Sequence, residues 1–165
     1  IGMWKAFSEL KELGWINCKL PRMIAVQATG CAPIVNAWEK GNKFAELWEN
    51  AHTIAAGIRV PVAIGDFLIL NVIRDSGGAA IAIDDETIIQ FRDALARAEG
   101  FLLCPEGAAT LAAYHECLKK GLVDKNEKAV LFNCASGIKY PLPPVYDRID
   151  IERAPVDYSR FVDSI

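Results

Sequence analysis

The stretch SGGAAIAIDDETI, residues 76–88, contains the end of one helix, a short strand and the start of a second helix. Two glycines stop the apolar run before it, and AAIAI at residues 79–83 has the length and composition of a buried strand. Asp84 and Asp85 follow, and aspartate is a favoured residue at a helix N-terminus. We therefore predict a buried strand with a helix on either side of it in the chain.

The segments after this stretch repeat the pattern. A helix from Asp84 would place Ile88, Phe91, Leu95 and Ala98 on one face and end at Gly100. FLLC at 101–104 is predicted as a strand, and Pro105 opens a helix that runs to about residue 119. KAVLFN at 128–133 is predicted as a further buried strand.

The segments before it contain the same alternation of helical spacing and short apolar strands. Residues 3–13 carry apolar side chains at helical spacing, and RMIAVQA at 22–28 is too short for a buried helix and is predicted as a strand. Pro33 starts a predicted helix to about residue 40, and a second helix is predicted over about 43–50. Asp66 is predicted to cap a helix whose residues 67–73 are apolar on nearly every face, so this helix is expected to be buried.

Alternating helices and apolar strands favour an α/β fold with three layers, α/β/α, around a mostly parallel sheet. Ligands in such sheets bind beyond the carboxyl ends of the strands. Three predicted strand ends carry distinctive residues: Ala28–Cys31, Cys104–Gly107 and Asn133–Gly137. The sequence therefore directs attention to these three segments as candidate parts of a site.

NCASGIK at 133–139 is the candidate that packing explains least well. A buried strand needs no polar, small and glycine residues at its end, whereas a thiol or hydroxyl there can bind a flat ligand. PEGAAT at 105–110 has two interpretations, because a helix N-terminus attracts anions while small residues also permit close helix–sheet packing. Packing is the favoured interpretation for that second segment taken alone.

Composition excludes several classes of function. The chain has 165 residues with a net charge of −3 and no basic block, which argues against a nucleic-acid partner. No apolar run reaches the ~18 residues of a membrane helix. Five scattered cysteines indicate a reduced, cytoplasmic setting rather than a disulfide framework. Only two histidines are present, and Asp84–Glu86 is interpreted as a helix start, so no metal site is expected.

Several segments together resemble threonine synthase, a pyridoxal-phosphate enzyme of fold type II. They are IGMWKAFSELKELGW, PRMIAVQATGCAPIVNAWEKG, AAGIRVP, IGDFLILNVIRDSGG, DDETI, EGFLLCPEGAATLAA and NCASGIKYP, in that order over residues 1–141. The resemblance implies threonine biosynthesis, in which O-phosphohomoserine and water give threonine and phosphate. Related ammonia-lyases and dehydratases that act on amino acids share the scaffold and remain an alternative.

The resemblance also implies which part of the enzyme this chain represents. In that family the Schiff-base lysine and the phosphate loop precede the segment that matches Ile1–Trp4, and no lysine here matches the family's lysine motif. We therefore expect residues 1–165 to be the C-terminal part of the cofactor-binding domain, with an irregular tail at 141–165, inactive alone and self-associating as a homo-oligomer. A stand-alone α/β binding module without catalysis is the rival hypothesis.

The site residues implied by the resemblance lie at the strand ends. The family's pyridine-nitrogen contact is a serine or threonine hydroxyl, and by position that residue is Cys134 here, which departs from the pattern. A thiol is a weaker donor than a hydroxyl, so either Cys134 makes a weak contact, or Ser136 substitutes for it, or the site has drifted. A neutral group at that nitrogen leaves the ring unprotonated. The expected cofactor contacts are Asn133, Cys134, Ser136 and Gly137, and the expected active-site neighbours are Arg59, Cys104, Glu106 and Gly107.

Overall fold

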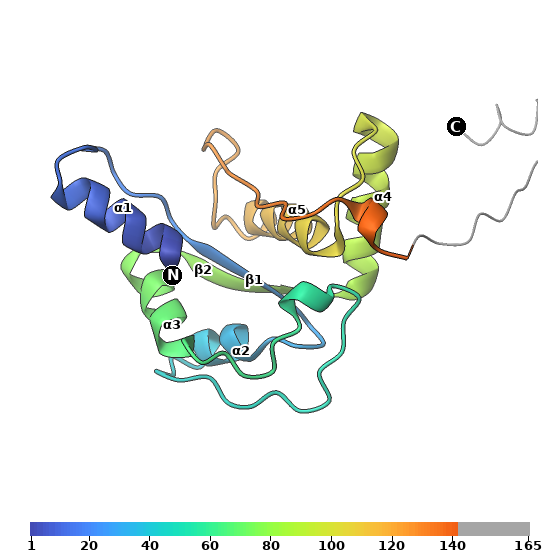
Figure 1. Ribbon diagram of the computed structural model, residues 1–165, viewed down its shortest axis with the longest axis horizontal. Helices are drawn as coiled ribbons and strands as arrows, with labels where there is room; N and C mark the ends of the chain where they lie inside the picture. The colour runs from blue at the N-terminus through green and yellow to red at the C-terminus, as the bar shows by residue number, and fades with distance from the viewer. Residues whose placement is uncertain (142–165) are drawn as a thin grey trace, which may run out of the picture.

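The computed structural model describes residues 1–141, in which helices lie on both sides of a small parallel sheet (Figure 1). The predicted helices at both ends of the AAIAI strand are present, as are the first helix and the helix opened by Pro105. The elements in order are α1 (Gly2–Glu12), β1 (Ile24–Ala28), α2 (Pro33–Glu39), the 3-10 helix η1 (Ala56–Ile58), α3 (Asp66–Asp75), β2 (Ala79–Ile83), α4 (Asp85–Glu99), α5 (Pro105–Lys119) and the 3-10 helix η2 (Gly137–Lys139).

β1 and β2 pair in parallel, with Ile24 opposite Ala79 and Ala28 opposite Ile83. Successive side chains of a strand point to opposite faces, and here each face meets its own helices. Ile81 and Ile83 pack in one core with α4 and α5, whereas Ala80 packs in a second core with α2 and α3. The α/β class and the covered parallel sheet are thereby confirmed for the described residues.

Local capping explains where the long helices begin and end. Asp84 accepts a hydrogen bond at Oδ1 from the Thr87 amide at 2.8 Å, which satisfies a free donor in the first turn of α4. Gly100 ends α4 in the left-handed conformation, at φ 66°. Cys104 caps α5, because its Sγ accepts from the Gly107 amide at 3.3 Å.

The helix predicted over 43–50 is wrong, because this segment is held by distant parts of the chain. The Ala45 amide donates to the Asp66 carboxylate at 2.6 Å. The Trp48 amide donates to the Pro61 carbonyl at 3.0 Å and its indole Nε1 donates to the Gly30 carbonyl at 2.9 Å. In a helix over 43–50 the Trp48 amide would bond the Phe44 carbonyl, so the bond to Pro61 replaces a helical one. Asp66 is also not the cap of α3, since Gly65 occupies that position.

The strands predicted at 101–104 and 128–133 are also wrong within the described part of the chain. Leu103 forms a single antiparallel bridge with Ser136 instead of a ladder. Val130 and Phe132 are 89% and 60% exposed, so the second segment is not buried. A strand needs a neighbouring backbone to pair with, and among residues 1–141 no backbone forms a ladder with 128–133. The burial predicted for α3 is limited to a stripe with Leu70 and Ile73, while Leu68 is 41% exposed.

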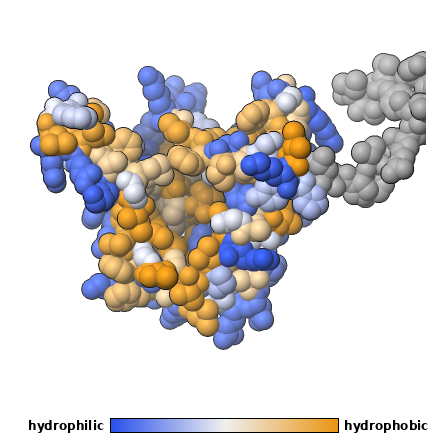
Figure 2. Space-filling view, viewed as in Figure 1, coloured by the Kyte–Doolittle hydropathy of each residue, from blue (hydrophilic) through white to orange (hydrophobic). Residues whose placement is uncertain are grey.

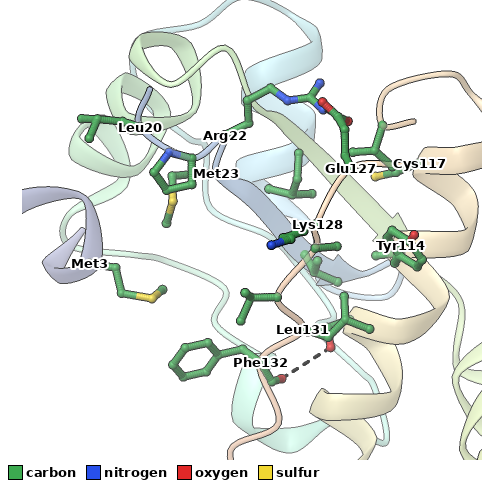
Figure 3. A pocket seen from close by; sticks show the side chains of 18 of the residues that line it. Met3, Leu20, Arg22, Met23, Tyr114, Cys117, Glu127, Lys128, Leu131 and Phe132 are labelled. Atoms are coloured by element: carbon green, nitrogen blue, oxygen red, sulfur yellow. Dashed lines mark hydrogen bonds and ion pairs between the residues drawn. The ribbon is translucent and has the colours of Figure 1, made fainter. Parts of the chain in front are cut away.

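An apolar groove of 540 Å³ opens between α1, β1, α5 and residues 128–132. Figure 2 shows a hollow surrounded by hydrophobic residues, and Figure 3 shows Met3, Met23, Leu131 and Phe132 around such a pocket. Along the described residues, no helix combines the length and the apolar character needed to span a bilayer.

Candidate functional site

Two of the three predicted strand ends lie against each other in the structure. The Cys104 amide donates to the Ala135 carbonyl at 3.3 Å, and the Gly137 amide donates to the Leu102 carbonyl at 3.0 Å. Together with the Leu103–Ser136 bridge, these bonds fasten 133–137 beside the start of α5. Segments that are about 30 residues apart in the sequence therefore form one surface, although neither is part of a regular strand.

Glycines permit this close approach. A Cβ on Gly107 would lie 2.2 Å from the Asn133 Oδ1, and a Cβ on Gly137 would lie 2.4 Å from the Leu103 carbonyl oxygen. Neither position has room for a side chain without movement of its neighbour. Gly107 and Gly137, both predicted as site residues, hold the two segments together by having no side chain.

A pair of thiols lies at the centre of this surface. Cys104 is fully buried and Cys134 is exposed, with 4.0 Å between their sulfur atoms. The Cys104 thiol donates to the Asn133 Oδ1 at 3.4 Å. Burial raises the pKa of Cys104, although hydrogen bonds from the Gly107 and Ala135 backbone oppose this effect. The Cys104 thiol is therefore protonated at neutral pH.

Ser136 and Cys134 give the surface its neutral hydrogen-bonding groups. The Ser136 Oγ accepts from the Ile138 amide at 3.4 Å and so begins η2, and a hydroxyl that accepts in this way still carries a proton to donate. Cys134 and Ser136 are both exposed, and between them lies only the small Ala135. A cavity of 260 Å³ reaches Gly107 and Asn133 from the side of α4, but Cys134 and Ser136 do not line it.

Glu106 is a buried carboxylate that joins three segments. It is 6% exposed and accepts from the Gly57 amide of η1 at 2.7 Å and from the Tyr140 hydroxyl at 2.7 Å. Burial alone raises the pKa of Glu106, but hydrogen bonds from Tyr140 and from backbone amides outweigh it and lower the pKa below its ordinary value. The same carboxylate raises the pKa of Tyr140 to about 12.

Tyr140 and Gly57 are site-forming residues that sequence reasoning missed. Tyr140 is 34 residues from Glu106 and Gly57 is 49 residues from it, so no local spacing connects them. A Cβ on Gly57 would lie 2.9 Å from the Glu106 Oε1, which explains why glycine stands there. No short motif in the sequence signals this contact.

Arg59 directly follows the 3-10 helix η1. It is exposed, and its charge lowers the pKa of the buried Cys31, which burial nevertheless raises overall. The loop that carries Arg59 is joined to α5 by the hydrogen bond from the Gly57 amide to Glu106 and by the packing of Ile58 against the core. The structure thus brings together the predicted residues of 104–107 and 133–137, whereas among the described residues no hydrogen bond or ion pair joins the Arg59 side chain to either segment. Within residues 1–141, no group of three or more histidine, cysteine, aspartate or glutamate side chains is placed to hold a metal ion.

Comparison with known proteins identifies the family. The model of the family "Pyridoxal-phosphate dependent enzyme" matches residues 1–135. The threonine synthase of Methanocaldococcus jannaschii is 36% identical over 84% of this chain and 34% of its own length. That of Mycobacterium bovis is 30% identical over 98% of this chain and 42% of its own length. The solved structure of maize serine racemase superposes with a TM-score of 0.47 at 24% identity, over 56% of this chain and 26% of that one.

The family match and the two threonine synthases bear out the resemblance seen in the sequence. The chain spans between a third and somewhat over two fifths of the length of these two threonine synthases. The family match covers every element from α1 to α5 and ends at Ala135, within the segment that forms the candidate surface. The chain belongs to the family of pyridoxal-phosphate dependent enzymes.

Proposed function

We propose that this chain is the C-terminal part of the cofactor-binding domain of an enzyme that forms threonine and phosphate from O-phosphohomoserine and water. The similarity to threonine synthases, at 36% identity over 84% of the chain, carries the proposal. Residues 1–141 form the body of that part, and residues 142–165 lie outside the described structure. Domain extent, substrate and self-association all remain predictions.

The surface at 133–137 has the chemistry required to hold the nitrogen end of pyridoxal phosphate. A thiol and a hydroxyl, on Cys134 and Ser136, are exposed on either side of a small residue, so a flat ring can approach their donors. The nearby carboxylate of Glu106 is already paired with Gly57 and Tyr140. The residues fit a neutral contact to the ring nitrogen, and they are the ones we assign to it.

When bound, pyridoxal phosphate withdraws electrons from the substrate carbon that loses its proton. The residues of this chain would position the cofactor ring and set the charge at its nitrogen. Cys134 or Ser136 would donate a hydrogen bond to the ring nitrogen and leave it without a full positive charge. Cys104 and Gly107 would hold 133–137 in place through the contacts described above, and Glu106 would hold Tyr140, which follows η2.

Exposed apolar residues support the view that this part is completed by others. Val130 and Phe132 are 89% and 60% exposed, and they border the apolar groove that Figure 3 shows. Monomeric proteins rarely leave apolar surface of this kind uncovered. We therefore expect the isolated chain to bind pyridoxal phosphate weakly, to form no threonine, and to self-associate.

The test is a chimera. In the Methanocaldococcus jannaschii threonine synthase, the matching 139-residue segment is replaced by that of this chain. The chimera is expected to bind pyridoxal phosphate and to release phosphate from O-phosphohomoserine. Cys134→Ala combined with Ser136→Ala should weaken cofactor binding about tenfold, which corresponds to the loss of one hydrogen bond.

Cys18→Ala is the matched control, because Cys18 is exposed in the loop after α1 and belongs to no part of the candidate surface. It should leave cofactor affinity unchanged. Deamination of serine or threonine by the chimera, without phosphate release, would assign the related lyase activity instead. Unchanged cofactor affinity in the double variant would show that 133–137 does not contact the ring.

A further inference from the structure

The two thiols at the candidate surface differ from the other cysteines of the chain, because they lie near each other. Their sulfur atoms are 4.0 Å apart, although they come from different segments, the cap of α5 and the segment after residue 132. Cys18, Cys31 and Cys117 have no such neighbouring thiol in the described structure. The cofactor contact that we propose uses Cys134 but assigns no chemistry to the pair.

We propose that Cys104 and Cys134 form a reversible disulfide when a peroxide reaches the exposed sulfur, and that this bond controls cofactor binding. The positions of the sulfur atoms support closure. The Leu103–Ser136 bridge and the bond from the Cys104 amide to the Ala135 carbonyl hold the two segments side by side. The two sulfur atoms already lie 4.0 Å apart, so a side-chain rotation can bring them to the ~2.05 Å of a disulfide bond.

Burial assigns a different step to each sulfur. Cys134 is exposed and meets the oxidant first, whereas Cys104 is fully buried beneath it and is inaccessible to a peroxide in solution. The Cys134 sulfur attacks one peroxide oxygen, the O–O bond breaks, and the thiol proton passes to the departing hydroxyl, so that a sulfenic acid and water result. The Cys104 sulfur then attacks the Cys134 sulfur, the S–O bond breaks, and the Cys104 proton passes to the departing hydroxyl, which leaves as a second water.

The atoms and electrons of this sequence balance. Two thiols and one hydrogen peroxide give one disulfide and two waters, and the two sulfurs lose the two electrons that the peroxide gains. A thiol such as dithiothreitol reverses the reaction. The Cys104 thiol is held as a hydrogen-bonded neighbour of Asn133 before the reaction, so closure requires side-chain rotation but no separation of the two segments.

The effect of this disulfide on cofactor binding rests on the proposed function, in which Cys134 contacts the ring nitrogen. In the disulfide, Cys134 has no proton to donate, and its sulfur is drawn toward the cap of α5. A ring nitrogen placed against Cys134 therefore loses that contact. Bound cofactor in turn covers Cys134 and slows its oxidation, because the exposed sulfur is the entry point for peroxide.

Peptide mapping tests the disulfide itself. The 165-residue chain and the chimera are treated with hydrogen peroxide, alkylated, and digested after basic and glutamate residues. The digest separates GFLLCPE (100–106) from CLK (117–119), and AVLFNCASGIK (129–139) carries Cys134. We expect the first and third peptides joined, and released by dithiothreitol. Cys104→Ser, which retains a capping oxygen, and Cys134→Ser should each abolish the linked species, while Cys18→Ser should not.

Measurements of cofactor binding test whether the disulfide regulates it. In the chimera, saturating pyridoxal phosphate should slow formation of the linked peptide at least about tenfold, and the oxidised form should bind the cofactor about tenfold more weakly until it is reduced. Absence of the linked peptide in cofactor-free protein would overturn the disulfide. A linked peptide that forms equally with and without cofactor would instead refute the placement of the ring at Cys134. It would also refute the regulation of cofactor binding by the disulfide.

Discussion

Replacing Glu106 by glutamine tests whether this carboxylate holds the candidate surface together. Glu106 is 6% exposed and accepts hydrogen bonds at 2.7 Å from both Gly57 and Tyr140. A hydrogen bond to a charged group contributes about 1.5–3 kcal/mol, and a neutral one about 0.5–1.5 kcal/mol. Glutamine keeps one carbonyl oxygen for the Gly57 amide and places an NH2 group against Tyr140, whose hydroxyl can accept from it. Both contacts then become neutral hydrogen bonds, and each loses about 1 kcal/mol. Glu106→Gln should therefore lower the free energy of unfolding by about 2 kcal/mol at pH 7.

The direction of the pH dependence follows from the pKa of Glu106. The fold lowers this pKa, so the unfolded chain binds the proton first as the pH falls. The stabilisation is fully present above the ordinary pKa of a glutamate and is lost as the pH falls through the lowered value. The difference between wild type and Glu106→Gln in urea unfolding should therefore shrink as the pH is lowered from about 7 to below about 4.

Tyr140 supplies an independent measurement of the same contact. Its pKa of about 12 is caused first by its hydrogen bond to Glu106, so in Glu106→Gln the pKa of this phenol should return toward 10, as followed by phenolate absorbance. The contribution of Tyr140 to stability is present below about pH 10 and is lost as the pH rises through about 12. A double-mutant cycle with Tyr140→Phe should give a coupling energy of about 1 kcal/mol, and Tyr114→Phe is the control. A glutamine variant that costs as much at acid as at neutral pH, with no coupling to Tyr140, would refute the reasoning.

Three further changes test the fold around the site. Asp84→Ala should lower the free energy of unfolding by about 1 kcal/mol, because it removes the cap on the Thr87 amide. The fold lowers the pKa of Asp84, so this cost should vanish in acid. A cost that persists in acid would contradict the assignment. Gly78→Ala should destabilise the protein, since its Cβ would lie 1.9 Å from the Met23 carbonyl oxygen at the start of β1; thermal unfolding equal to wild type would contradict this contact. Leu70→Ala should cost about 2–5 kcal/mol in urea unfolding because Leu70 is fully buried, and a loss below about 1 kcal/mol would argue against the second core.

Contacts between distant segments decided what local sequence patterns left open. Short apolar runs such as 101–104 and 128–133 resemble buried strands, yet a strand exists only where a neighbouring backbone pairs with it. Residues 43–50 have the composition of a helix. Hydrogen bonds from the Ala45 amide to Asp66 and from the Trp48 amide to the Pro61 carbonyl override that preference. The meeting of Cys104 with Asn133, and of Glu106 with Tyr140, joins residues 29 and 34 positions apart.

The sequence by itself determined the elements whose signals are local. AAIAI between two glycines and two aspartates specifies β2 and the start of α4, because turn and cap residues act within one turn of the chain. Pro105 specifies the start of α5 in the same way. Only the tertiary structure decided that the cap of α5 lies against 133–137. The glycines at 107 and 137 have no side chains and so let the two segments approach each other. A contact between distant segments leaves no periodic pattern in the sequence from which it could be predicted.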